Sequence, residues 1–128
     1  MRSTRSFISY LIVVALIPAL GFAQTKGDAK AGKQKYDWAG CGGCHGATGQ
    51  GNGPAAADLN PQPSDFTNGK YMITLSDKYL FGIIKGGGAS VKKSPLMPSW
   101  GGWLKDEDIW NLVAYIRSLA QLPYKPPK

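Results

Sequence analysis

The sequence predicts an all-α fold in which three main helices are joined by long loops, and three observations lead to this prediction. Near the C-terminal end, apolar residues recur at helical spacing over a full-length helix. Two shorter helical patterns precede it, beginning near residues 28 and 76. No segment alternates apolar and polar residues over the length of a strand, so we expect little or no sheet.

The N-terminal residues 1–23 have the pattern of a signal peptide. Arg2 and Arg5 precede an apolar run, and Ala23 ends it with a small residue at the predicted cleavage position. A retained membrane anchor is the alternative, because the apolar run is only slightly shorter than a bilayer-spanning helix. With cleavage after Ala23, residues 24–128 form one domain of an exported, periplasmic protein with no remaining membrane span.

The first helix is predicted to begin after Asp28, whose carboxylate can cap it, and to run to about Trp38. Gly32 and Tyr36 lie one turn apart on the face that can approach another helix closely. From residue 41 to residue 68 the chain is rich in Gly, Pro, Ala and Asn, which predicts irregular backbone. So long a loop in a small domain needs something to wrap around.

The second helix has Ser76 as its predicted cap and Gly86 at its end, with Leu75 and Leu80 placed as a hydrophobic staple. The last helix has the clearest pattern, and Pro123 should close it. Three acidic residues, 106–108, stand at its N-terminus, where the helix dipole favours negative charge. Its apolar positions are Ile109, Leu112, Val113, Ile116, Leu119 and Ala120.

The chain is basic, with 15 Lys and Arg against 8 Asp and Glu. Lys predominates over Arg, and no helix-turn-helix or zinc-finger pattern is present, so a nucleic acid is not the expected partner. The positive charge favours acidic protein partners instead. Lys85, Lys92 and Lys93 are the candidates to attract them, and an ordinary solvated surface is the alternative interpretation of these lysines.

Residues Cys41-Gly42-Gly43-Cys44-His45 match the Cys-x-x-Cys-His pattern of covalent haem attachment. Two thiols at this spacing can add to the two vinyl groups of one haem, and the adjacent imidazole can bind the iron. Three alternatives are a plain disulfide, a redox-active thiol pair and a zinc site. A zinc site would need a fourth ligand, and the chain has no second Cys or His cluster.

The second axial ligand of a haem iron must come from a side chain other than His, because His45 is the only histidine. Met72 and Met97 are the thioether candidates once the signal peptide has left. Met97 is favoured, since Pro95 and Pro98 stiffen the segment that presents it. Met72 lies near apolar residues and is better explained as core packing.

These residues resemble class I c-type cytochromes, in particular the small bacterial monohaem type. The resemblance extends over nearly all of residues 27–120. It depends on Gly32 and Tyr36, Cys41-Gly42-Gly43-Cys44-His45-Gly46, Gly53-Pro54, Pro95-Leu96-Met97-Pro98-Ser99-Trp100 and Ile109-Trp110-Asn111-Leu112-Val113-Ala114-Tyr115-Ile116-Arg117.

The resemblance implies a cytochrome c fold whose loops wrap around one covalent haem c, with the first and last helices crossing at Gly32 and Tyr36. It also implies that the carbonyl of Pro54 accepts the second imidazole hydrogen of His45. Lys105 stands where such proteins usually have Ser or Thr as the cap of the last helix. Asp106 is therefore the predicted cap, one residue later.

The predicted function is single-electron transfer in a periplasmic respiratory or oxidative chain, not enzymatic catalysis. With His45 and Met97 both on the iron, no position is free for a substrate. Trp100, Trp103 and Trp110 are expected to surround the haem or to pack in the core. Partners are redox proteins that dock briefly, and the protein itself is a monomer or a subunit of a redox complex. A haem enzyme or gas sensor, in which Met97 does not bind, is the nearest alternative.

Overall fold

The computed structural model describes residues 27–122, so the predicted signal peptide and Pro123 lie outside the described residues. Within this range the chain is helical and contains no β-strand, only one isolated bridge between Asn68 and Gln121. The predicted all-α fold is confirmed. No helix in this range has the length and hydropathy that crossing a bilayer would require. The elements are α1 (Ala29–Trp38), α2 (Gly42–His45), η1 (Ala56–Asp58), α3 (Gly69–Met72), α4 (Asp77–Gly86), η2 (Gly88–Val91) and α5 (Asp106–Leu119).

Two of the three predicted caps are present in the structure. The Asp28 carboxylate accepts from the backbone N–H of Lys30 at 2.7 Å and of Ala31 at 3.0 Å, so α1 begins where its cap predicts. The Ser76 hydroxyl accepts from the Tyr79 N–H at 3.1 Å and starts α4. Both interactions span two or three residues, which is why the local sequence predicts them.

The start of α5 corrects the prediction that Asp106 caps this helix. The cap position is Lys105, whose extended backbone precedes the first helical residue and whose side chain has no acceptor atom. Asp106 is already inside the first turn, and its Oδ1 accepts from Lys85 Nζ at 2.6 Å instead. The Asp108 carboxylate accepts from the Lys105 N–H at 3.3 Å, which is one half of a capping box.

The segment 41–68 is less irregular than its composition predicts. It contains α2 directly at the cysteine motif and η1 further on, and α3 follows it. Each of these elements has three or four residues. A helix of one turn is too short to show apolar periodicity, so these three short helices cannot be predicted from a segment rich in Gly and Pro.

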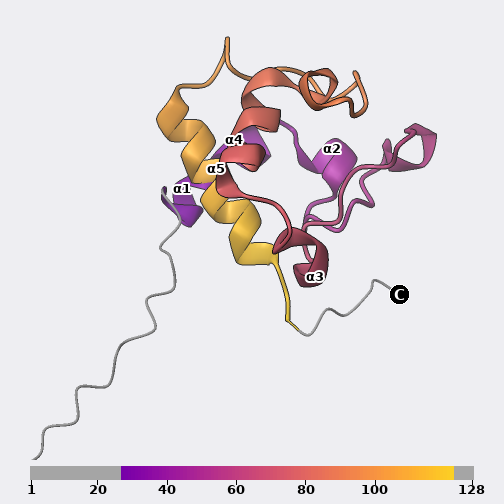
Figure 1. Cartoon of the computed structure of the whole chain (residues 1–128), viewed down its shortest axis with the longest axis horizontal. Coiled ribbons are helices and arrows are strands. Elements are labelled where there is room, and N and C mark those ends of the chain that lie inside the picture. The colour runs from indigo at the N-terminus through magenta and orange to yellow at the C-terminus, as the bar shows by residue number, and fades with distance from the viewer. Residues whose placement is uncertain (1–26, 123–128) are drawn as a thin grey trace, which may run out of the picture.

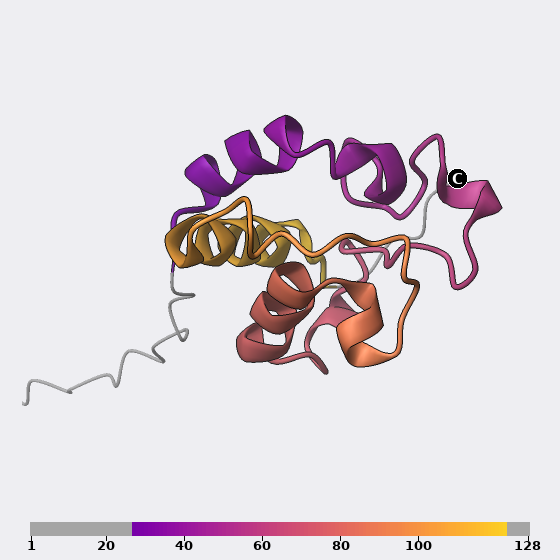
Figure 2. The same ribbon diagram turned by 90° about the horizontal axis from the view of Figure 1, so that it is seen from above.

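Helix α5 lies between α1 on one side and α4 on the other (Figure 1 and Figure 2). The close contact of α1 with α5 depends on Gly32, because a Cβ at this position would overlap the Asn111 carbonyl and lie 2.8 Å from the Tyr115 Cβ. One turn later the Tyr36 ring meets the Tyr115 ring edge-on, with centroids 5.2 Å apart. The crossing at Gly32 and Tyr36 that the resemblance implies is confirmed.

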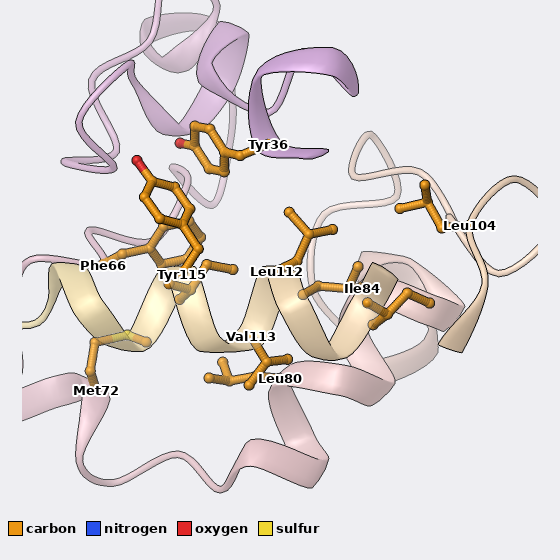
Figure 3. Packing of buried hydrophobic residues seen from close by; sticks show 11 residues of the cluster. Tyr36, Phe66, Met72, Leu80, Ile84, Leu104, Leu112, Val113 and Tyr115 are labelled. Carbon is orange, nitrogen blue, oxygen red and sulfur yellow. The ribbon is translucent and has the colours of Figure 1, made fainter. Parts of the chain in front are cut away.

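The buried core gathers around α5 (Figure 3). Tyr115 and Leu112 project towards α1, whereas Val113 projects towards Leu80 of α4. Met72 is only 1% exposed and packs within this core, which agrees with its interpretation as a packing residue. The cluster consists of Tyr36, Phe66, Met72, Leu80, Ile84, Leu104, Ile109, Leu112, Val113, Tyr115 and Ile116.

Arg117 joins the end of α5 to the turn between α3 and α4. Its Nε donates to Asp77 Oδ1 at 2.6 Å, its Nη1 donates to the Met72 carbonyl at 2.5 Å, and its Nη2 donates to the Leu75 carbonyl. The guanidinium therefore satisfies two backbone carbonyls and one carboxylate that lie about 40 residues earlier in the chain. This interaction holds α3 and α4 in place beside the site described next.

Candidate functional site

A cavity of about 430 Å³ lies between the cysteine motif, the α3–α4 region and the loop before α5. Its volume is within the range of roughly 300–1,000 Å³ that is usual for small-molecule sites. The lining is mostly apolar, and Cys41, Cys44, His45 and Met97 all contribute to it. Further apolar lining residues include Leu59, Pro61, Pro63, Phe66, Tyr71, Leu75, Tyr79, Leu80, Ile83, Ile84, Leu96, Pro98, Trp100, Leu112 and Ile116.

The cysteine motif forms one tight turn that begins at Cys41 and continues as α2. The His45 N–H donates to the Cys41 carbonyl at 2.9 Å and closes this turn. The following loop then folds back beneath it, because Gly51 N–H donates to the His45 carbonyl at 2.8 Å and Gly53 N–H donates to the Cys44 carbonyl at 3.0 Å. These bonds fix the backbone of all three motif residues on one wall of the cavity.

The His45 ring is held by two contacts from the segment 64–66. Its Nδ1 lies 3.2 Å from the Ser64 carbonyl oxygen, and the ring stacks on Phe66 with centroids 4.4 Å apart and planes at 18°. Burial lowers the pKa of His45, and the Ser64 carbonyl opposes this shift only in part. Since a carbonyl can only accept, Nδ1 carries the hydrogen, which leaves the Nε2 lone pair of a neutral imidazole free to bind a metal.

The ring partner is Ser64, whereas the resemblance implies Pro54. In this structure Pro54 lines a separate Gly-rich hollow together with Gly42, Gly43 and Gly53, and it does not line the main cavity. On either side of Pro54, the Gly53 N–H donates to the Cys44 carbonyl and the Ala55 N–H donates to the Gly43 carbonyl, both at 3.0 Å. Ser64 contributes only a backbone carbonyl, which every residue has, so no sequence signal marks it.

The two cysteines are free and partly buried in the described structure. Burial raises the pKa of the Cys41 thiol to about 11, so this thiol is protonated at neutral pH. No disulfide joins the pair. Among residues 27–122, no three His, Cys, Asp or Glu side chains are arranged to hold a bare metal ion.

Met97 reaches the cavity from the loop between η2 and α5. Its carbonyl accepts from the Gly88 N–H at 3.0 Å, and its own N–H donates to the Ser94 carbonyl at 3.3 Å. A Cβ on Gly88 would overlap the Ser94 carbonyl, so this glycine permits the close approach of the loop. The Trp100 N–H also donates to the Ile84 carbonyl at 3.1 Å, so the loop is anchored to α4 as well as to η2, and Met97 is presented from a defined backbone.

The three tryptophans occupy different environments, and only Trp103 departs from the expectation that these residues surround the haem or pack in the core. Trp100 lines the cavity, and Trp110 stacks on Phe81 with centroids 4.5 Å apart. Trp103 is 79% exposed and belongs neither to the cavity wall nor to the core. It follows Gly101 and Gly102, which carry no side chains to cover it.

The three lysines that are candidates to attract acidic partners are not equivalent. Among residues 27–122, Lys93 is the only Lys, Arg, Asp or Glu that lines the cavity. Lys85 Nζ bonds to Asp106 Oδ1 at 2.6 Å, so its charge is partly balanced within the protein. Lys92 is exposed.

The residues of this site fit a covalent haem. Two thiols and one imidazole from the same turn line an apolar cavity, and a thioether lines the cavity from a loop far along the chain. An apolar cavity suits the porphyrin ring, the thiols suit its vinyl groups, and sulfur and nitrogen suit its iron. Neither a dinucleotide nor a phosphate would use this combination of groups.

The comparisons identify the class of protein. The cytochrome c family model matches residues 29–120, which is most of the chain, and this protein belongs to that family. Members of the family bind haem c covalently and generally transfer electrons. A comparison with curated proteins found no match.

Two solved structures are similar to this chain. One is the reducing HAO-like protein complex Kustc0457/Kustc0458 of Kuenenia stuttgartiensis, with 30% identity and a TM-score of 0.60. The match covers 73% of this chain and 44% of that chain, so this protein spans less than half of its relative. The other is the KustC0563 c-type cytochrome, with 21% identity, a TM-score of 0.56 and coverage of 70% of this chain and 98% of that one. The second likeness supports the fold alone.

Proposed function

We propose that this protein is a class I cytochrome that carries single electrons in a periplasmic respiratory or oxidative chain on one haem c. The observation that carries the proposal is the convergence of Cys41, Cys44, His45 and Met97 on one apolar cavity. The first three come from a single turn, whereas Met97 comes from a loop more than fifty residues later. His45 and Met97 would bind the haem iron.

Each part of the chain has a distinct task in this function. The haem supplies one-electron redox chemistry at its iron. The thiols of Cys41 and Cys44 hold it covalently, and neutral His45 offers Nε2 while Ser64 and Phe66 fix its ring. The apolar lining excludes water, which lowers the cost of reorganisation when the charge of the site changes and stabilises the less charged, reduced form.

If His45 and Met97 both bind the iron, a substrate would have to displace one of them to reach it, so we propose a carrier and not an enzyme. The competing function is a haem enzyme or gas sensor with an open sixth position. Carbon monoxide tests this alternative directly. The reduced wild-type protein should bind it poorly, and rapid, stoichiometric binding would favour the open site.

Met97→Ala should abolish the weak sulfur-to-iron absorption band at the red end of the oxidised spectrum, because the variant has no thioether in the cavity. It should also open the sixth position, so that the reduced variant binds carbon monoxide. Met72→Leu is the matched control, since it removes a thioether from the core and keeps its volume. Survival of the band in Met97→Ala, or its loss in Met72→Leu, would show that Met97 is not the ligand.

We further propose that positive charge at the cavity mouth attracts acidic redox partners. Lys93 lines the cavity and the exposed Lys92 precedes it. Charges placed near the docking edge change the association rate more than the affinity, and salt screens them.

Ferricyanide, an anionic oxidant, can serve as the probe of this charge. Its reaction with the reduced protein should slow as ionic strength rises, and the double variant Lys92→Glu/Lys93→Glu should slow it by roughly 3–10-fold at low salt. A variant with the same change in charge, Lys30→Glu/Lys33→Glu on α1, should have a smaller effect, because neither lysine lines the cavity. Equal slowing by the two double variants would show that net charge alone, and not the position of the lysines, sets the rate. A rate of ferricyanide reduction that does not change with salt would contradict electrostatic attraction.

Bacterial c-type cytochromes are typically exported, which supports a periplasmic location for this family member. Cleavage after Ala23 and a haem count of one remain part of the proposal. The N-terminal sequence of the purified protein tests the cleavage site, and a retained Met1 would argue for the membrane anchor instead.

A further inference from the structure

Tyr36 connects the crossing of α1 and α5 to the residue that follows His45. Its hydroxyl donates to the Gly46 carbonyl at 2.7 Å, and its side chain is only 1% exposed. Its ring is fixed edge-on against Tyr115, and both hydroxyls lie on the same side of this contact in Figure 3. Tyr36 is also part of the cavity lining.

Packing alone does not explain the hydroxyl of Tyr36. A Phe at this position would fill the same space between α1 and α5 and would bury no polar group. Burying a hydroxyl costs free energy unless the hydroxyl is hydrogen-bonded. The Gly46 carbonyl also accepts from the Gly49 N–H at 3.1 Å, so it already has a partner from its own loop. The hydroxyl thus adds a second bond, and this bond comes from a different helix.

The bond reaches the peptide group next to the predicted iron ligand. Gly46 directly follows His45, and the His45 carbonyl itself is held by the Gly51 N–H at 2.8 Å. From the other side, Ser64 and Phe66 contact the imidazole ring. Two sets of contacts therefore define the direction of the ring: one acts on its backbone and the other on its side chain.

We propose that Tyr36 is a positioning residue that sets the orientation of the His45 imidazole plane through the Gly46 carbonyl. The proposal depends on the proposed ligation of iron by His45. In this arrangement the α1–α5 contact determines more than stability. Through the Tyr36–Gly46 hydrogen bond, the position of α1 also sets the position of His45. Removing the Tyr36 hydroxyl should therefore alter the haem spectrum of a protein that remains folded.

The test compares Tyr36→Phe with Tyr115→Phe in the haem-loaded protein. Both changes remove one hydroxyl from the same interface, and Tyr115 is also nearly buried, at 8% exposed. The difference is that Tyr36 donates to Gly46, whereas among residues 27–122 no hydrogen bond involves the Tyr115 hydroxyl. Proton NMR of the oxidised protein reports the ring orientation, because the spread of the hyperfine-shifted haem methyl signals depends on the planes of the axial ligands. Tyr36→Phe should change this spread, and Tyr115→Phe should leave the wild-type pattern.

Equal patterns in wild type and Tyr36→Phe, or the same change in both variants, would overturn the positioning role. A second measurement needs no variant. The Tyr36 hydroxyl proton of the wild-type protein should exchange slowly and show an Overhauser contact to the Gly46 α-protons, and its absence would also count against the proposal. If the wild-type spectrum lacked hyperfine-shifted His45 ring protons, the ligation itself would fail and the positioning role with it.

Discussion

His45→Ala is expected to abolish the low-spin haem spectrum of this protein. The chain contains no other histidine, so no second imidazole can replace it. The variant keeps Cys41 and Cys44, but the iron loses its nitrogen ligand on the side of the attachment turn. We expect a large loss of haem-loaded protein, measured as haem per polypeptide after purification, and a high-spin spectrum for any haem that remains.

Free imidazole provides the control for this variant. The cavity left by the side chain is next to Phe66 and the Ser64 carbonyl, so added imidazole should occupy it and restore a low-spin spectrum. Restoration would separate loss of the ligand from loss of the fold. A wild-type spectrum in His45→Ala without imidazole would contradict the assignment of the axial ligand.

Gly32→Ala should be the most destabilising small substitution in the α1–α5 contact. The added methyl group would overlap the Asn111 carbonyl and press on the Tyr115 Cβ, and both belong to a helix that cannot move without disturbing the core. Overpacking of this kind costs about 1–3 kcal/mol in the free energy of unfolding. Chemical denaturation of the haem-loaded protein measures this loss.

Gly82→Ala is the matched control, because Gly82 lies inside α4 and a Cβ there meets no atom within 4 Å. Alanine has the higher helix propensity, so this variant should gain roughly 0.5–1 kcal/mol. Opposite signs for the same chemical change would show that the close helix contact, and not glycine content, determines the effect. A Gly32→Ala variant as stable as the wild type would contradict the crossing described here.

The parts of the fold that are predicted correctly from the sequence are determined by interactions between residues close together in the chain. Asp28 and Ser76 cap helices through bonds to residues two or three positions away, and a local pattern contains that information. The apolar spacing of α5 likewise appears as a buried stripe. In contrast, Arg117 acts on Asp77 and on carbonyls about 40 residues away, and no local pattern reports such a bond.

The candidate site divides in the same way. The cysteine motif is contiguous, so its five residues are recognised together, and Met97 is marked by the prolines on either side. Ser64 is not predictable, since it contributes a backbone carbonyl, and the choice between Ser64 and Pro54 depends on how the loop folds. The exposure of Trp103 also escapes prediction, because a sequence does not show whether a large apolar side chain finds a partner.

The central claim is that Cys41 and Cys44 bind one haem covalently, and the intact mass of the purified protein tests it most directly. We predict the mass of the polypeptide plus that of one haem, with neither thiol left to react with an alkylating reagent under denaturing conditions. The pyridine haemochrome spectrum should be that of a haem attached through two thioether bonds. A mass equal to the polypeptide alone, or two thiols that remain reactive after haem has been supplied, would contradict the account.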